Sequence, residues 1–530
     1  MRRPLRGMRR SSRPARRHRF LPAAVLASVL ALSSCSAGGA TRAADTGDLT
    51  MQFEGPPVSL DPAKAGNGGS TTFVSLAYDP LIYLSGDGRL VPDLATSWGF
   101  AGDSNTVFDL RLRDGVTFSD GAPLTARAVV ASMRYFLHAG GGLVGNVGHI
   151  AKVEALGPMK VRVTFADPNP EAPMAMTQYN GMGNIIGPKG LAHPASLLTA
   201  SDGTGQYVYD GQDSIAGNRY VYRRNDHYFR PSAQQFDTVS IKVIGDPNAV
   251  LAAAKTGQVQ YANGSANTVD AARAAGLRIN TAPFYNWALN LVDRTGKVSP
   301  PLADSRVRHA IALAFDRSTI AHGLAGAYAS ASDQIMLPGT DGYKASLGYR
   351  HNVARAKRLL AQAGYPHGFR LTVLTQSIID PNTNYSQAIA AALGDIGIDV
   401  TLRVESTGIA QFTGDALSKQ YAATIFPNVG ASMQATDLQI MSGVFNPFGS
   451  SDKELNSLLA RAAAQTDAGA RTDLYQQASR RLQQLAWFVP VFATKNISYS
   501  SPDLEHVTSS VVNPNPVPVG PTAAYSWRLK

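Results

Sequence analysis

The chain has 530 residues, enough for roughly two to four domains, and 44% of them are apolar, which is sufficient to build hydrophobic cores. Its net charge of +11 comes mostly from the N-terminus, because nine Arg lie between Arg2 and Arg19 and the first 35 residues contain no Asp or Glu. Without those nine charges the rest of the chain carries +2, and it contains no Lys/Arg run. The composition therefore gives no support for nucleic acid as a partner.

The N-terminus has the order of a bacterial export signal. An Arg-rich stretch precedes the apolar run Phe20–Leu32, whose 13 residues are interrupted only by Pro22 and Ser28. Such a run is too short to cross a bilayer of about 30 Å as a helix, so we expect a signal peptide over residues 1–35. The stretch Arg16–Leu21 is similar to a twin-arginine signal with its apolar pair displaced by one, so both the general secretory and the twin-arginine routes stay open.

Leu32-Ser33-Ser34-Cys35 resembles the lipobox of bacterial lipoproteins, in which the cysteine becomes the first mature residue and carries lipid. Cys35 is the only cysteine of the chain, so a disulfide framework and a cysteine metal cluster are excluded. The resemblance implies diacylglycerol and palmitate on Cys35, a flexible tether over residues 36–48, and a location at the outer face of the cytoplasmic membrane, in the periplasm or cell envelope. The alternative is an ordinary signal peptide with an incidental cysteine.

Beyond the tether, strand and helix patterns alternate along the chain. Alternating apolar residues predict strands, and longer apolar spacing behind a capping residue predicts helices. In chain order, the expected elements are strand 108–112, a helix capped by Thr125, strands 161–165 and 239–243, helices capped by Asp304 and Asn352, strand 371–373, a helix over 474–485 and strand 487–492. No period of 20–50 residues repeats, which argues against a solenoid or propeller. The pattern predicts an α/β fold with mixed sheets.

Six blocks, taken together and in order, resemble the extracellular solute-binding proteins of family 5, which bind peptides, nickel complexes or sugars. They span nearly all of the chain beyond the tether: Val58–Pro62, Leu90–Val129 (with LVPDLATSWGF and LRDGVTFSDGAPLTA), Gly203–Arg230, Phe236–Ala262, Pro300–Ile320 and Ala354–Thr375.

The resemblance implies a two-lobed fold of the periplasmic-binding-protein kind, with a hinge between the lobes and an extra domain fused to lobe one. We expect lobe one over residues 49–76, 186–282 and 500–530, the extra domain over 77–185, and lobe two over 283–499. A solute held between the lobes favours hinge closure. The implied role is that of a lipid-anchored monomer, without a cofactor, that captures a small solute, a short peptide in the leading hypothesis, for an ABC permease and its ATPase subunits.

Two segments are the first candidates for contact with the solute. Gly66, Asn67 and Gly68 follow the first block, where the family presents lobe-one backbone to an extended peptide by β-augmentation; the alternative is a surface turn. Tyr285, Trp287 and Asn290 begin lobe two beside a hinge crossing, and we expect at least one of the two aromatic side chains to face the cleft. The alternative is that alternate residues of this strand belong to the core.

The third candidate segment comprises Phe426, Asn428, Val429, Gly430 and Ala431. Peptide-binding relatives place a Trp and an Asp here, and that Asp pairs with the α-ammonium group of the peptide, whereas this chain has Asn428 and Ala431 at those places. A buried ammonium without a charged partner would cost several kcal/mol. Either another acid replaces the Asp, with Asp437 near in sequence, or the solute has no free amine there.

The sequence contains no recognisable set of catalytic residues. HExxH and GxSxG are absent, and the SxxK-like Ser450–Lys453 and Lys255-Thr256-Gly257 occur in the wrong order for a penicillin-binding protein. We therefore expect no enzyme and no metal site. Three alternatives stay open beside peptide capture: the same fold binding a glycan, metal chelate, haem or modified amino acid; an envelope lipoprotein that signals or assists without transport; and, last, a surface hydrolase.

Overall fold

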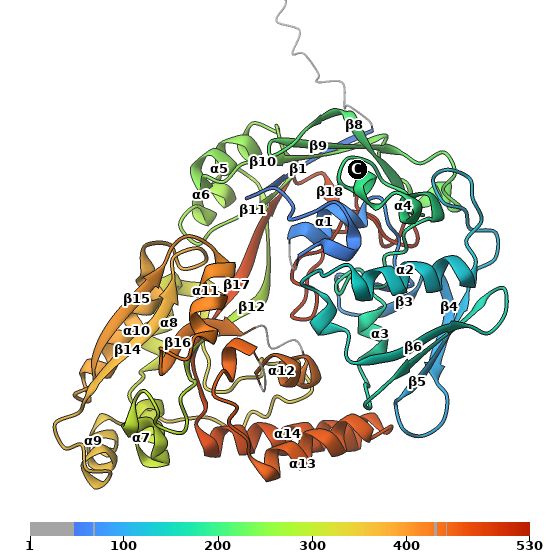
Figure 1. The fold of residues 1–530 in the computed structure, drawn as a ribbon. Helices are drawn as coiled ribbons and strands as arrows, with labels where there is room; N and C mark the ends of the chain where they lie inside the picture. The colour runs from blue at the N-terminus through green and yellow to red at the C-terminus, as the bar shows by residue number, and fades with distance from the viewer. Residues whose placement is uncertain (1–46, 67–68, 429–431, 441–442) are drawn as a thin grey trace, which may run out of the picture. The chain divides into compact units, whose positions relative to one another are not determined.

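The computed structural model describes residues 47–66, 69–428, 432–440 and 443–530. Its main sheet has 11 strands and combines parallel with antiparallel pairs, which confirms the α/β class with mixed sheets (Figure 1). Across this sheet the strands follow the order β15 (Asp399–Glu405), β14 (Arg370–Gln376), β16 (Ala423–Asn428), β12 (Arg278–Leu291), β17 (Phe488–Ser500), β11 (Tyr261–Asn263), β1 (Asp48–Phe53), β10 (Thr238–Val243), β9 (Arg219–Arg224) and β8 (Tyr207–Ile215), while β13 (Ala329–Ala331) pairs with β17.

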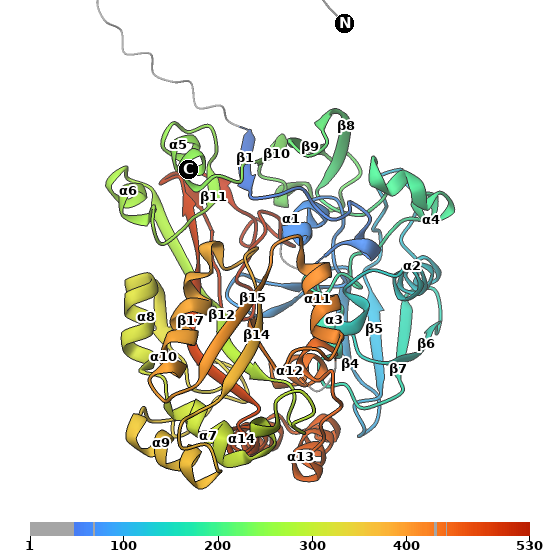
Figure 2. The same cartoon turned by 60° about the vertical axis from the view of Figure 1, so that its left-hand side comes forward.

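Two long antiparallel strands, β12 and β17, join the two halves of this sheet. They pair from Arg278 opposite Ser500 to Asn290 opposite Phe488, with a register shift between Pro283 and Tyr285. On one side β17 pairs with β11, and on the other β12 pairs with β16. Figures 1 and 2 show the two strands running side by side between the halves. The irregularity beside Pro283 lies next to the crossing expected at residues 282–283, where a bulge allows local bending.

A second sheet, of four antiparallel strands, lies within the segment expected to form the extra domain. Its order is β4 (Ala95–Phe100), β5 (Val107–Leu112), β7 (Lys160–Phe165) and β6 (Ile150–Ala155). Phe108, Leu110 and Leu112 of β5 are fully or almost fully buried on one face, as their alternation predicts. Two small pairs complete the strands: β2 (Ile82–Leu84) with β3 (Leu90–Pro92), and β18 (Leu504–Glu505) with β19 (Arg528–Leu529).

The predicted helix starts are confirmed by their capping bonds. The side chains of Thr125, Asp304 and Asn352 accept hydrogen bonds from the first-turn backbone N–H groups of α2, α7 and α9. The helices are α1 (Gly69–Ser75), α2 (Ala126–His138), α3 (Ala172–Ala175), α4 (Pro188–Ala192), α5 (Pro247–Lys255), α6 (Val269–Ala274), α7 (Ser305–Leu313), α8 (Arg317–Ala325), α9 (Val353–Gln362), α10 (Asn384–Gly394), α11 (Ile409–Leu417), α12 (Met433–Ile440), α13 (Lys453–Ala464) and α14 (Ala468–Leu485). Among the described residues, no helix combines the length and apolar character that crossing a membrane requires.

The buried side chains form separate hydrophobic cores. The largest joins the segment expected to be the extra domain to β1, β10 and the C-terminal residues 504–527, so these parts share one core. A second core lies around Trp287, Ile311 and Val373, and a third packs α13 and α14 around Leu459 and Tyr475. The exact domain boundaries given above stay a prediction.

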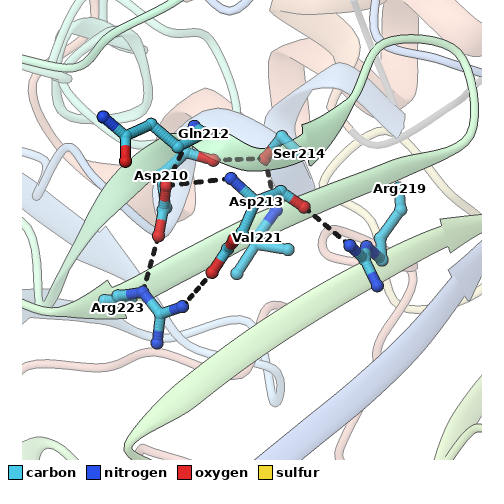
Figure 3. Close-up of polar contacts among 7 residues, drawn as sticks. All are labelled: Asp210, Gln212, Asp213, Ser214, Arg219, Val221 and Arg223. Atoms are coloured by element: carbon cyan, nitrogen blue, oxygen red, sulfur yellow. Dashed lines mark hydrogen bonds and ion pairs between the residues drawn. The ribbon is translucent and has the colours of Figure 1, made fainter.

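At one end of the main sheet, β8 is bent by an irregular stretch between Asp210 and Ile215. Asp210 Oδ1 accepts hydrogen bonds from the backbone N–H groups of Gln212 and Asp213, and Arg223 of β9 forms ion pairs with Asp210 and Asp213 (Figure 3). A bent strand end with paired charges is a poor template for a further strand.

Candidate solute-binding site

Several of the predicted contact residues lie outside the described residues: Asn67, Gly68, Val429, Gly430 and Ala431, as does the lipid-attachment candidate Cys35. Gly66 is half-buried, and a Cβ at its position would lie 3.2 Å from Cγ2 of Val58, whose own side chain is 78% exposed. A side chain at Gly66 would therefore crowd this turn. Its role as a backbone contact stays a prediction.

The two predicted aromatic contacts differ in their surroundings. Trp287 is fully buried; its ring stacks on Phe492 with centroids 6.2 Å apart and meets Tyr385 edge-on at 4.9 Å. Its side chain presents no surface to a solute in this structure, because it packs inside the lobe-two core. Tyr285 is only partly buried, so of the two aromatic side chains it is the one accessible to a solute.

The predicted polar contacts on β12 and β16 bond within the sheet. Asn290 Nδ2 donates to the carbonyl oxygen of Phe426 at 3.1 Å, and Asn428 Nδ2 donates to Asn290 Oδ1 at 3.5 Å. Both asparagines are almost completely buried, although Asn428 Oδ1 has no partner among the described residues. Phe426 stacks on Phe412, with ring centroids 4.8 Å apart. The structure thus gives Asn290, Asn428 and Phe426 packing roles, and solute contact by them stays a prediction.

Three carboxylates that come from both sides of the predicted cleft lie within electrostatic range of one buried tyrosine. Glu171 directly precedes α3 in the segment expected to form the extra domain, Asp341 lies in a lobe-two loop, and Asp437 lies on α12. Burial raises the pKa of Tyr475 on α14, and the charges of Asp341, Glu171 and Asp437 raise it further. We call Glu171, Asp341 and Asp437 the acid cluster.

The carboxylates of the acid cluster are poorly neutralised. Burial raises the pKa of Glu171 to about 7, with Asp341 adding to the shift and Arg471 opposing it. Burial alone raises the pKa of Asp437 to about 6, and it also raises that of Asp341. Among the described residues, Glu171 and Asp437 take part in no side-chain hydrogen bond or ion pair. Desolvated carboxylates that form no ion pair favour the arrival of a cation.

Two polar residues from the segments predicted to be lobe one and the extra domain lie near Tyr285. Burial raises the pKa of Tyr285 to about 12, and both Glu54 and Tyr179 lie near enough to raise it further. Glu54 belongs to the segment that follows β1 and accepts a hydrogen bond from Asn263 Nδ2 at 2.9 Å. Tyr285 therefore lies within electrostatic range of residues from two other segments of the chain, and its place beside the cleft stays a prediction.

The described residues include no group of three or more His, Cys, Asp or Glu that could hold a metal ion. The sequence identified Asp437 as a substitute acid but missed Glu171, Asp341 and Tyr475. No motif marks them, because they come from three segments far apart in the chain and meet only through folding.

Two half-sheets joined by the β12–β17 pair, with charged residues from both sides facing one another, define a two-lobed solute-binding protein. The chain belongs to the bacterial extracellular solute-binding proteins, family 5, whose middle-region model matches residues 89–447. It is therefore a substrate-binding protein of the ABC-importer type, in a family of extracellular and periplasmic transport proteins rather than enzymes.

Known proteins share this fold over nearly the whole chain. The glutathione-binding protein GsiB of Escherichia coli O6:K15:H31 is 23% identical over 488 residues, covering 84% of this chain and 89% of its own length. The structure of AgaA from A. tumefaciens R10 with agropinic acid is 23% identical and superimposes with a TM-score of 0.76, covering 91% and 99% of the two chains. DppA from Helicobacter pylori with the peptide STSA is 21% identical, has a TM-score of 0.75, and covers 91% and 98%.

Proposed function

We propose that this protein captures short peptides between its two lobes and delivers them to a membrane permease driven by ATPase subunits. The observation that carries the proposal is the acid cluster, where the carboxylates of Glu171 and Asp437 are desolvated and form no ion pair with a described residue, although Arg471 lies near enough to oppose the rise in the pKa of Glu171. A peptide brings one α-ammonium group in a fixed place whatever its side chains are. Charge recognition of that group fits a protein that must accept many sequences.

In this proposal Asp437 replaces the aspartate that peptide-binding relatives carry near position 431, and Glu171 reaches the same group from the opposite side of the cleft. Asp341 plays a different part, because its Oδ1 accepts a hydrogen bond from the backbone N–H of Met433 at 2.9 Å and so caps α12. Glu171 belongs to the segment predicted to be the extra domain and Asp437 to the segment predicted to be lobe two, so a cation bound between them would favour closure of the hinge.

Family members that bind other solutes define the competing hypothesis. Solved structures with the same fold hold agropinic acid, mannopinic acid, Fe(III)-EDTA or Ni(L-His)2. DppA holds a peptide, and glutathione, which names the relative GsiB, is itself a short peptide with a free amine. The uncompensated acids favour a solute with a cationic group and disfavour an anionic chelate, whose charge they would repel.

The same proposal includes export and anchoring. The signal peptide over residues 1–35 would direct the chain across the membrane, and lipid on Cys35 would retain it at the outer face. A diacylglycerol and a further acyl chain supply the two lipid signals that stable anchoring requires.

Calorimetric titration with two peptide pools tests the proposed solute. One pool contains mixed tri- to pentapeptides, and the other contains the same peptides acetylated at the N-terminus. We expect the free-amine pool to bind and acetylation to weaken binding by about 100-fold, which corresponds to loss of a desolvated charge pair. Equal affinity for both pools would show that the protein does not recognise the α-ammonium group. If neither pool binds, a non-peptide solute is favoured.

A further inference from the structure

A groove of about 780 Å³ lies on the surface of lobe two and shares no residue with the acid cluster. Its walls come from one face of α7, the first turns of α9 and the end of α14, with the loop 348–350 closing one side. These three helices lie close together in Figures 1 and 2. All lining residues fall within the segment predicted to be lobe two, so hinge motion would leave the groove unchanged.

The groove is strongly basic. Arg350, Arg355 and Arg480 line it, are exposed, and form no side-chain hydrogen bond or ion pair with any described residue. Arg481, the residue after Arg480, differs from the three because it forms ion pairs with Asp452 at 2.7 Å and with Glu454 at 3.2 Å. Three positively charged side chains without an acidic partner among the described residues thus line one groove.

The walls of the groove are held in place before anything binds. His309 Nε2 lies 2.7 Å from the carbonyl oxygen of Gln484, and the Tyr349 hydroxyl donates to the carbonyl oxygen of Gln483 at 2.5 Å. Leu313 and Leu359 add apolar surface to the lining. A rigid hollow with apolar surface and guanidinium groups can bind a chain segment that carries carboxylates.

We propose that this arginine groove docks an acidic chain segment on the outer face of the permease. The identity of the partner as the permease rests on the proposed transport function, whereas the affinity of the groove for an acidic segment does not. A lipid surface is flat and would be served better by a convex basic face than by a hollow between helices. Because the groove stays within one lobe, docking through it is independent of whether the cleft is open or closed.

The test uses the full chain and a fluorescent hexaglutamate peptide. The variant is Arg350→Gln/Arg355→Gln/Arg480→Gln. The control, Lys255→Gln/Arg127→Gln/Arg403→Gln, removes the same charge from exposed positions elsewhere in the fold that form no ion pair with a described residue. Fluorescence anisotropy gives the affinity at several salt concentrations, and solute binding is measured for each protein. Solute uptake is then measured in the producing cells.

We expect the groove variant to bind hexaglutamate about tenfold more weakly or worse, with a smaller salt dependence, while the control stays like the wild type. Uptake should fall in the groove variant although its solute affinity is unchanged. Equal hexaglutamate affinity in all three proteins would overturn the proposal, as would binding of inorganic phosphate or anionic phosphatidylglycerol vesicles through the groove without binding of hexaglutamate. If the wild-type protein does not bind peptides, the proposed function is contradicted, but the hexaglutamate result remains valid on its own.

Discussion

Asp341 Oδ1 accepts the backbone N–H of Met433 at 2.9 Å, and Asp437 lies one turn further along the same helix with no partner of its own among the described residues. The first carboxylate is explained by capping the helix. The carboxylate of Asp437 is desolvated and has no positively charged partner among the described residues, which costs folding free energy unless a ligand supplies that positive charge.

Asp437→Asn should therefore weaken solute binding and leave the ligand-free protein as stable as before, or more stable. We expect an affinity loss of about 10- to 100-fold, because a charge-assisted contact becomes a neutral one. Calorimetric titration and thermal unfolding measure the two effects. Asp473→Asn, at an exposed position of α14, is the matched control and should change neither. A loss of stability without loss of affinity would assign Asp437 a structural role.

Solute affinity should fall as the pH decreases from about 8 to 5. The pKa of Glu171 is raised to about 7 and that of Asp437 to about 6, so both are protonated at the acidic end of this range. A bound cation favours the ionised carboxylates, and binding must then expel their protons. The expected limit is about tenfold in affinity per pH unit for each proton released.

The stability of the ligand-free protein should change with pH in the opposite sense. Folded pKa values above the unfolded values of about 4 mean that these two groups destabilise the fold when charged. The stability advantage of Glu171→Gln/Asp437→Asn over the wild type should thus be largest above pH 7 and shrink toward pH 4. Chemical denaturation across this pH range measures it, and a constant difference would show that these acids titrate normally.

Removing Arg230 should destabilise the protein strongly. Arg230 Nη1 lies 3.2 Å from Asp93 Oδ1, and Asp79 is buried nearby with its pKa raised by burial and by the charge of Asp93. Arg230→Met would remove the ion-pair partner of Asp93 and leave only Arg113 to oppose the charge of that buried carboxyl group, so it should cost about 3–5 kcal/mol. Arg224→Met, at an exposed ion pair with Asp237, should cost less than about 1 kcal/mol. Urea unfolding compares them, and similar losses would contradict this account.

The two aromatic residues of β12 should separate stability from binding. Trp287→Ala removes a fully buried ring and should lower the free energy of unfolding by about 3–5 kcal/mol. Tyr285→Ala should weaken solute binding with a smaller loss of stability, because its side chain is only partly buried beside Glu54 and Tyr179. If Tyr285→Ala leaves the affinity unchanged, Tyr285 does not contact the solute.

Cys35→Ser should abolish lipid attachment. Cells fed a labelled fatty acid should incorporate it into the wild-type protein and not into the variant, which should be released from the membrane fraction. Ser34→Ala, a neighbouring change that keeps the cysteine, is the control. Labelling of the serine variant would place the lipid elsewhere, and an unlabelled wild-type protein would indicate an ordinary signal peptide.

Local pattern was enough to predict the strands and helices that the sequence analysis names. The period-two runs at residues 108–112 and 239–243 became β5 and β10, and the caps at Thr125, Asp304 and Asn352 start helices as expected. These features depend on neighbouring residues only. Alternation could not show that β12 continues as one strand from Arg278 to Leu291 across the predicted hinge, because its pairing with β17 is long-range.

The candidate site was harder to predict for the same reason. Trp287 and Tyr285 point to the same face of a strand by alternation, yet the first is enclosed by Phe492 and Tyr385 and the second is partly open, which only packing decides. Glu171 has no local signal at all. Its raised pKa arises from burial and from Asp341, 170 positions away in the chain.

Native mass spectrometry of the protein, purified gently from an exporting host, shows whether the cleft holds short peptides by their ammonium group. We expect a ladder of bound masses that match short peptides, and we expect Glu171→Gln/Asp437→Asn to lose it. A single bound non-peptide mass, or a cleft that stays empty when peptide pools are added, would contradict this expectation.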